Sequence, residues 1–213
     1  MSGLAVTLTP AEFARRLRAG GFSPALAVPG GASGALPPAL GKVLGQVAVS
    51  DIRTRFQTGT APDGVRWRPL KHPRPTGGNQ PLLDTGGLRA SIHAVPDPAG
   101  VTVQTTHPAA ALHQFGGVVR PRRAKMLAIP LTKEARRSGG PRRFGKKLAL
   151  RPTRKSRVFL LVATVRGKDV AQFVLVRAVA VPARPFMGLS AAGLETAARA
   201  IAEFAGAAWA AGR

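Results

Sequence analysis

Proline and glycine interrupt this sequence so often that few stretches are free to form long regular elements. The chain of 213 residues contains 19 prolines and 25 glycines, which are dense in residues 23–38 and 57–81. Proline removes a backbone donor and glycine favours turns, so both segments are predicted to be loops. Two stretches keep apolar residues at helical spacing, residues 39–56 and 186–209. We therefore expect two long helices, one in the N-terminal half and one at the C-terminal end.

Between these helices, the sequence predicts short strands that are mostly neighbours along the chain. β-prone runs flank turn sequences and predict two hairpins, over residues 92–105 and 158–177. A further strand is expected at residues 126–130, a short helical segment at 85–91, and a short helix or irregular segment at 109–115. The predicted fold class is α+β, because sequence-adjacent strands favour antiparallel pairing. It has a small, mostly antiparallel sheet packed with a long N-terminal-half helix and a C-terminal helix, with long loops.

The length fits one domain with an additional arm. Thr9 can cap a short helix, and the proline- and glycine-rich stretch that follows is typical of a linker. Residues 1–37 are therefore expected to form an N-terminal helix and a flexible linker. Residues 38–213 are expected to form a single α+β domain, with a basic loop at about residues 132–157.

Basic residues greatly outnumber acidic ones. The chain has 32 lysines and arginines against 9 aspartates and glutamates, a formal net charge of +23, and no cysteine. The lack of cysteine excludes disulfides, a thiolate zinc site and a cysteine nucleophile, and so few carboxylates disfavour two-carboxylate catalysis. No apolar stretch has the length of a membrane span, and the first residues do not resemble a signal peptide. We expect a soluble, intracellular protein without membrane contact, whose neighbours are nucleic acid or acidic protein surfaces.

The charge is most concentrated in residues 136–157, where ten of 22 positions are basic and none is acidic. Glycine and proline argue against a stable helix there, so we expect an extended basic arm. Such an arm could follow a phosphate backbone or dock as a solvated loop on an acidic neighbour, and the sequence leaves both readings open. Its one aromatic residue, Phe144, disfavours base stacking as the main binding mode. The candidate DNA-facing or partner-docking residues are Arg136, Arg137, Arg142, Arg143, Lys146, Lys147, Arg151, Arg154, Lys155 and Arg157.

No catalytic or metal-binding constellation stands out in the sequence. The histidines, His72, His93, His107 and His113, lack the spacing of a helical metal site. The glycine-rich stretch 30–34 has neither the preceding strand nor the Lys-Ser/Thr end of a phosphate-binding loop. Nuclease chemistry would need a carboxylate cluster for magnesium, which the sequence does not offer. We therefore expect no enzymatic activity, no cofactor and no bound metal.

Four segments carry a family resemblance, namely residues 56–70, 81–92, 109–117 and 182–190. In their order and spacing they resemble the virion morphogenesis, or tail completion, proteins of Mu-like tailed phages. The resemblance spans about residues 38–205. The family-motif residues are Pro62, Asp63, Gly64, Trp67, Leu70, Leu83, Asp84, Thr85, Gly86, Leu88, Ser91, Ile92, His113, Gln114, Phe115, Gly116, Gly117, Arg184, Pro185 and Phe186.

The resemblance implies a non-enzymatic building block of the virion neck, assembled in the host cytoplasm. It implies a ring of identical subunits, commonly six, around the DNA channel. The partners would be head connector or portal-side proteins and tail tube or terminator proteins, with non-specific contact to packaged double-stranded DNA. The chain departs from the family pattern at Gly87, where arginine is usual, and at Pro108, where tyrosine is usual. The alternative function is that of a sequence-independent nucleic-acid-binding protein acting alone.

The first two motif segments have structural roles available. Residues 62–64 are expected to form a turn, and Trp67 and Leu70 to pin the long loop to the core. Asp84 and Thr85 are expected to cap a short helix.

The remaining motif residues are also predicted to act structurally. Leu88 and Ile92 should be buried, and Gln114 should satisfy backbone groups. His113 is expected to be a packed, hydrogen-bonded residue, and Phe186 to anchor the last helix.

Overall fold

The computed structural model of the chain describes residues 4–8, 36–72, 74–75, 78–98, 100–154 and 157–211. The helix predicted after Thr9 and most of the predicted linker lie outside the described residues. The predicted boundary between an N-terminal arm and a domain at residue 38 therefore stays a prediction.

The chain forms two compact units. The helical unit comprises Met1–Arg68, Gln80–Phe115 and Ala183–Arg213, and the sheet unit comprises Pro69–Asn79 and Gly116–Pro182. The sequence predicts one domain over residues 38–213, whereas each unit here has its own buried core. The chain passes from one unit to the other next to proline or glycine at three of the four crossings. These residues end regular structure, but their pattern alone does not reveal which strands share a core.

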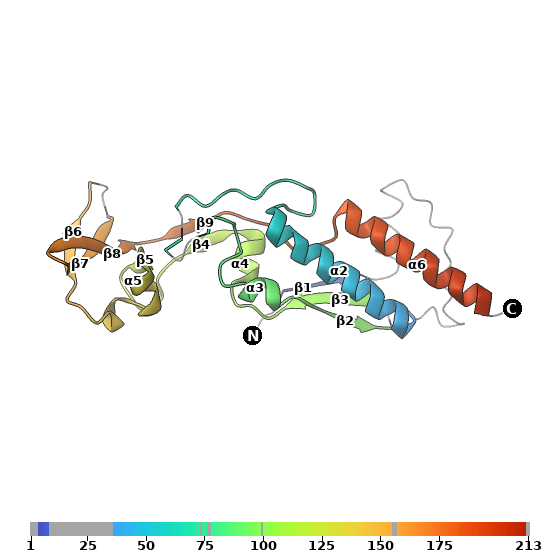
Figure 1. Cartoon of the computed structure of the whole chain (residues 1–213). Coiled ribbons are helices and arrows are strands. Elements are labelled where there is room, and N and C mark those ends of the chain that lie inside the picture. Colours follow the sequence, from blue (N-terminus) through green and yellow to red (C-terminus); the bar gives the residue numbers. More distant parts are fainter. Residues whose placement is uncertain are drawn as a thin grey trace. The chain divides into compact units, whose positions relative to one another are not determined.

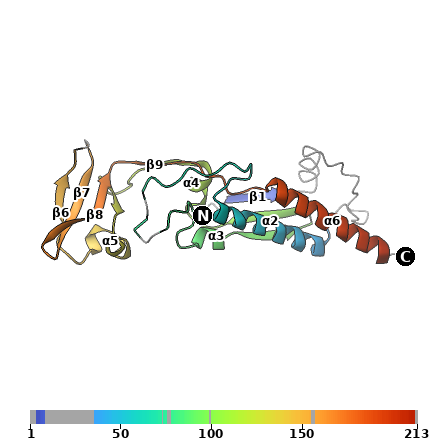
Figure 2. The ribbon, with the colours of Figure 1, turned by 45° about the horizontal axis from the view of Figure 1, so that its top comes forward.

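The helical unit is built around the first predicted long helix, α2 (Pro38–Thr58). Proline at its start is compatible with helix geometry, and Gly59 ends it with a left-handed φ of 71°. Ile52 and Phe56 are buried on one face of α2, as the helical spacing predicts, and Leu40 is buried near its start. Figures 1 and 2 show α2 beside the C-terminal helix and over the strands of this unit.

The C-terminal helix, α6 (Ala191–Ala211), begins later than the predicted start at Phe186. Residues 186–190 are instead a non-helical segment whose backbone is held by side chains from elsewhere in the unit. Ser190 marks the helix start, because its hydroxyl accepts the N–H of Gly193 at 3.1 Å.

A three-stranded antiparallel sheet completes the helical unit, in the order β1-β3-β2. The predicted hairpin over residues 92–105 is confirmed as β2 (His93–Asp97) and β3 (Gly100–Thr105). The strand β1 (Leu4–Leu8) pairs with β3 and was not predicted, because its partner is far away in the sequence. Two short helices, α3 (Gly87–Ala90) and α4 (Ala110–Phe115), lie at the positions that the sequence indicates.

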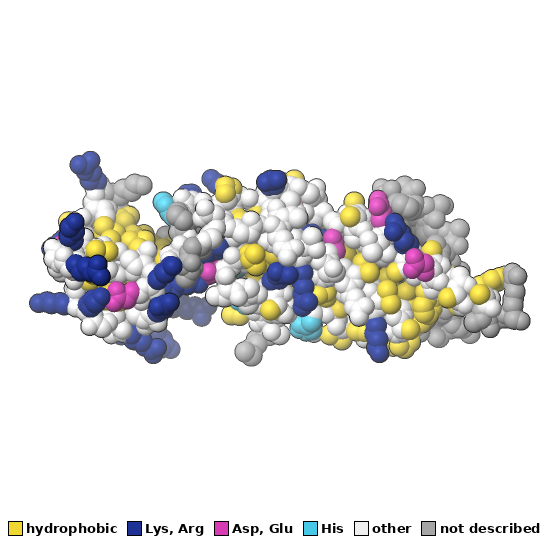
Figure 3. Space-filling model, in the orientation of Figure 1, with side chains coloured by type: hydrophobic (Ala, Val, Ile, Leu, Met, Phe, Trp, Pro, Cys, Tyr) yellow, Lys and Arg dark blue, Asp and Glu magenta, His cyan; other side chains and the backbone are white. Residues whose placement is uncertain are grey.

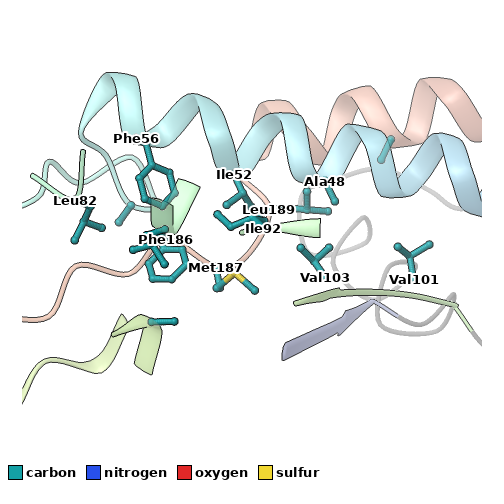
Figure 4. Packing of buried hydrophobic residues seen from close by; sticks show 14 of the residues in the cluster. Ala48, Ile52, Phe56, Leu82, Ile92, Val101, Val103, Phe186, Met187 and Leu189 are labelled. Atoms are coloured by element: carbon teal, nitrogen blue, oxygen red, sulfur yellow. The ribbon is translucent and has the colours of Figure 1, made fainter. Parts of the chain in front are cut away.

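The core of the helical unit lies beneath α2 (Figure 4). Ile52 and Phe56 point from the helix toward Phe186 and Ile92, and all four side chains are almost completely buried. The ring of Phe56 packs against Phe186, with centroids 5.5 Å apart, and edge-on against Trp67 at 5.7 Å. These aromatic contacts join helix, loop and chain segments that are distant in sequence.

The sheet unit contains a four-stranded antiparallel sheet in the order β5-β8-β7-β6. The second predicted hairpin is confirmed as β7 (Phe159–Val165) and β8 (Lys168–Val176), and the predicted strand near residue 126 as β5 (Leu127–Pro130). A separate antiparallel pair is formed by β4 (Gly117–Val119) and β9 (Val179–Val181).

The predicted extended basic arm is wrong, because most of this segment is folded into the sheet unit. It contributes the helix α5 (Lys133–Arg137), the 3-10 turn η1 (Pro141–Arg143) and the edge strand β6 (Ala149–Pro152). Phe144 is 7% exposed and packs edge-on against Phe173, with ring centroids 5.6 Å apart. An aromatic residue that the sequence presents as part of a solvated arm therefore anchors a small core.

The predicted α+β fold class is confirmed. Helices and strands are mixed along the chain, every strand pairing in the described residues is antiparallel, and long loops join the elements. The strands form three small sheets where the sequence predicts one.

Candidate functional site

Three of the four motif segments meet at the segment just before α6. We call residues 184–190 the junction segment. Three other regions bind it through hydrogen bonds: the helix α2, the loop that contains Trp67, and the helix α4. All of these residues belong to the helical unit.

The loop that contains Trp67 and the start of the junction segment each donate hydrogen bonds to the backbone of the other. The indole Nε1 of Trp67 donates to the carbonyl oxygen of Pro185 at 2.8 Å. In return, Nε and Nη2 of Arg184 donate to the carbonyl oxygen of Arg68 at 3.0 and 2.9 Å. Arg184 is only 5% exposed, so this guanidinium serves to satisfy backbone in the interior.

The helix α4 holds the middle of the junction segment. The side-chain oxygen Oε1 of Gln114 accepts the N–H groups of Phe186 and Met187, at 2.9 and 3.0 Å. The carbonyl oxygen of His113 accepts the N–H of Arg184 at 2.8 Å. The prediction that Gln114 satisfies backbone groups is confirmed, and the two donors that it satisfies lie before the first turn of α6.

The helix α2 holds the end of the junction segment through a buried ion pair. Nη1 of Arg55 donates to the carbonyl oxygens of Phe186 and Gly188, at 2.9 and 2.6 Å, and Nη2 donates to the carboxylate of Asp51. That carboxylate also accepts the N–H and the hydroxyl of Ser190, at 2.9 and 2.6 Å. One carboxylate thus connects α2 to the first turn of α6.

Burial is the dominant electrostatic effect at Arg55. It lowers the pKa of the guanidinium, and the neighbouring Asp51 carboxylate only partly offsets this shift. Arginine remains charged at neutral pH, so the buried cation depends on Asp51 and the two carbonyl oxygens for compensation. Space is also reserved for this pair, because a Cβ atom at Gly193 would lie 2.5 Å from Oδ2 of Asp51.

Sequence reasoning missed Asp51 and Arg55 as a pair. Arg55 suits the C-terminal end of α2, which is a sufficient explanation when only the sequence is considered. The available signal was their i, i+4 spacing of opposite charges next to Ile52 and Phe56, which lie on the buried stripe.

The predicted turn at residues 62–64 is confirmed. Gly64 has a φ of 83°, and the N–H of Val65 donates to Oδ1 of Asp63 at 3.0 Å. Trp67 is 6% exposed, as predicted for a packed loop. Leu70 is only half-buried and belongs to the sheet unit, so it does not pin the loop to the same core.

The predicted capping of α3 differs in position, because the residue at the N-cap is Gly86, with a φ of 81°. The hydroxyl of Thr85, one residue earlier, accepts the N–H of Gly87 in a long hydrogen bond of 3.5 Å. Glycine adopts this left-handed conformation without steric cost, which makes a side-chain cap unnecessary for the turn itself. The predicted burial of Leu88 and Ile92 is confirmed, with exposures of 5% and 0%.

An open groove of about 580 Å³ runs between α2 and β2. Lys42, Arg53, Arg89 and His93 are among the residues that line it, and none of its lining residues is an aspartate or glutamate. The groove therefore offers cations but no carboxylate for acid–base or metal chemistry. In the described part of the chain, no group of three or more metal-ligating side chains comes together.

The predicted basic residues lie on the sheet unit. Nine of the ten are described, on α5, η1, β6 and the loops between them, while Lys155 lies outside the described residues. All nine are exposed except Arg136, which is half-buried. Figure 3 shows these cationic side chains gathered over α5 and β6–β8, with few acidic ones among them.

Sequence reasoning also underestimated how far this basic surface extends. The sheet unit includes further exposed cations from outside residues 136–157, because its strands bring distant segments into one body. These are Lys71, Arg120, Arg122, Arg123, Lys125, Lys133, Arg166, Lys168 and Arg177.

We expect the loss of the Gln114 side chain to weaken the junction segment. In Gln114→Ala, the N–H groups of Phe186 and Met187 lose their acceptor, which should lower the free energy of unfolding by about 1–3 kcal/mol. Gln114→Glu should retain most of the stability, because a carboxylate oxygen can accept the same two donors. Urea denaturation of the purified chain measures both, with the exposed Gln57→Ala as a control. A loss for Gln114→Ala no larger than that of the control contradicts the role.

The buried hydrogen bonds of the junction segment define a structural site, in which side chains hold backbone groups in place. None of the described helices is long and apolar enough to cross a membrane. The chain belongs to the phage virion morphogenesis family, which it matches over residues 31–204. Its role is accordingly in building the phage virion, as the resemblance in its motifs implies. No curated protein and no solved structure matches the chain.

Proposed function

We propose that this chain is a structural neck protein of a tailed phage, which completes the tail or joins it to the head. Identical copies of the chain form a ring of six subunits around the DNA channel. Head connector or portal-side proteins lie on one side of the ring, and tail tube or terminator proteins on the other. The family membership supports the assembly role on which this proposal builds.

The observation that carries the proposal is the use of the motif residues in the helical unit. Trp67, Gln114 and Arg184 all bind backbone of the interior, and each is at least half-buried. Residues that mark a family and serve to hold a chain segment in place favour a protein that acts by shape and mutual contact. We therefore propose that the chain has no enzymatic activity and uses no cofactor.

Removal of the chain from an infected cell tests this function. Phage that lack it should accumulate separate heads and tails, and supply of the intact chain should restore joined, infectious particles. Imaging of restored particles should place the chain at the neck and show the number of copies in the ring. Normal infectious particles without the chain, or its location anywhere other than the neck, would contradict the proposal.

A sequence-independent nucleic-acid-binding protein acting alone is the second candidate, and the basic surface of the sheet unit favours it. The two functions differ in where the chain is found. After nuclease treatment, a neck protein still sediments with phage particles, whereas a protein that binds nucleic acid on its own is released when its nucleic acid is digested.

A further inference from the structure

The positive charge of the chain is divided very unequally between its two units. The sheet unit consists of segments of 11 and 67 residues, and it holds 20 of the 32 basic residues and two of the nine acidic ones, a net charge of +18. The helical unit holds the other 12 basic and seven acidic residues, a net charge of +5. The unusual charge of the chain is therefore a property of one folded body.

The basic residues of the sheet unit lie at its surface. Of the 19 that are described, 17 are exposed, and the other two are half-buried. The two carboxylates of the unit are already engaged, Glu134 with Lys146 at 2.8 Å and Asp169 with Arg151 at 3.3 Å. The unit thus displays a large excess of cations that its own carboxylates cannot neutralise.

The two ion pairs also show that separate basic segments border one another. The Lys146–Glu134 pair brings the loop after η1 to α5, and the Arg151–Asp169 pair brings the edge strand β6 to the hairpin of β7 and β8. Arg166 lies in the turn of that hairpin, and Lys168 is the first residue after the turn. The basic segments therefore lie beside one another on one folded unit and do not form an isolated flexible arm.

The sheet unit has no exposed phenylalanine, tyrosine or tryptophan, and this limits which kind of binding partner fits its basic surface. The three aromatic residues of the sheet unit are Phe144 and Phe173, which are buried, and Phe159, which is half-buried. Single-stranded nucleic acid binds through bases stacked on aromatic side chains. Protein interfaces also depend on large aromatic anchors, which this surface lacks. A regular phosphate backbone needs only closely spaced cations.

We propose that the sheet unit is a sequence-independent binding surface for the phosphate backbone of double-stranded DNA. Arginine and lysine contact phosphate oxygens, and such contacts carry no information about base sequence. Binding releases condensed counterions, so it weakens steeply with added salt, and it relieves the repulsion among the cations of the unit. The biological setting of this surface rests on the proposed neck function, but binding itself is a property of the purified chain.

Two variants of equal charge change test where the DNA binds. The first, Arg142→Gln, Arg143→Gln, Lys147→Gln and Arg154→Gln combined, removes four exposed cations of the sheet unit. The control, Lys42→Gln, Arg66→Gln, Arg68→Gln and Arg199→Gln combined, removes four exposed cations of the helical unit. Thermal unfolding of both variants verifies that the fold is retained.

The measurement is the affinity of the full chain for a short duplex of mixed sequence, by fluorescence anisotropy over a range of salt concentrations. Each lost phosphate contact should reduce the slope of log affinity against log salt by about 0.9. In the sheet-unit variant, we expect the slope of log affinity against log salt to be smaller in magnitude by roughly 2–4. The affinity for the duplex should fall by at least about tenfold. The control should stay within about threefold of the unaltered chain, because long-range charge effects are screened.

Equal losses in the two variants would overturn the proposal, since net charge alone would then explain the binding. Tighter binding of a single-stranded oligonucleotide than of the duplex would also overturn the proposal. Weak duplex binding together with tight binding of polyglutamate would overturn it as well, because it would indicate an acidic protein partner. The proposed neck function fails independently, in the deletion experiment. A chain that joins heads to tails yet does not bind duplex DNA refutes only the DNA surface.

Discussion

Replacement of Asp51 by alanine should lower the free energy of unfolding by about 3–5 kcal/mol, because it leaves a buried guanidinium without its counter-ion. Arg55 is 3% exposed and Asp51 15%, so solvent cannot take over the lost interaction. The variant also removes the acceptor for the N–H and hydroxyl of Ser190, at the start of α6. Chemical denaturation followed by circular dichroism measures the effect.

The exposed Glu203 on α6 provides a matched control, and Glu203→Ala should change stability by less than about 0.5 kcal/mol. A second variant separates the buried charge from other effects. In Asp51→Ala combined with Arg55→Met, an apolar side chain replaces the orphaned cation, and part of the lost stability should return. The role of the pair is contradicted if Asp51→Ala resembles the control, or if the double variant is less stable than the sum of the two single variants.

The regular elements of this chain were predictable where their signals are local. Apolar residues at helical spacing correctly predict α2, and β-prone runs beside turn sequences correctly predict both hairpins and the strand β5. The start of α6 was predicted too early, because the sequence from Phe186 onward is compatible with a helix. In the folded chain, Gln114 and Arg55 bind the backbone of this segment, so distant side chains determine where the helix starts.

The basic segment shows a different limit of sequence reasoning. Its glycines and prolines indicated an extended arm, but β6 forms because it pairs with β7, and Phe144 is buried because it meets Phe173. Both partners come from later in the chain, so neither contact leaves a signal in the segment itself. The concentration of charge was predicted, whereas its extension over a whole folded unit required the structure.

The junction segment was predictable in part. The sequence indicated the packed Trp67, the acceptor role of Gln114 and the anchoring Phe186 one by one. It could not indicate that they act on the same segment, because their hydrogen bonds span many tens of residues. The ion pair of Asp51 and Arg55 was missed, since an opposite-charge pair at this spacing is usually a solvated feature of a helix surface.

The second large effect is expected at Trp67, where alanine should lower the free energy of unfolding by about 3–5 kcal/mol. The substitution removes the edge-on contact with Phe56 and leaves a cavity in the core of the helical unit. It also removes the indole donor to the carbonyl oxygen of Pro185, so that one of the two links between the loop and the junction segment is lost. The measurement is urea denaturation of the purified chain, followed by circular dichroism.

The chain contains its own control for this substitution, because its other tryptophan, Trp209, is 72% exposed near the end of α6. Trp209→Ala should change stability by less than about 1 kcal/mol, whereas a packed Trp67 makes its loop part of the core. A change of less than about 1 kcal/mol for Trp67→Ala would mean that the loop folds without its anchor. The junction segment would then depend on its remaining hydrogen bonds, and Gln114→Ala should be more damaging in the Trp67→Ala background than in the unaltered chain.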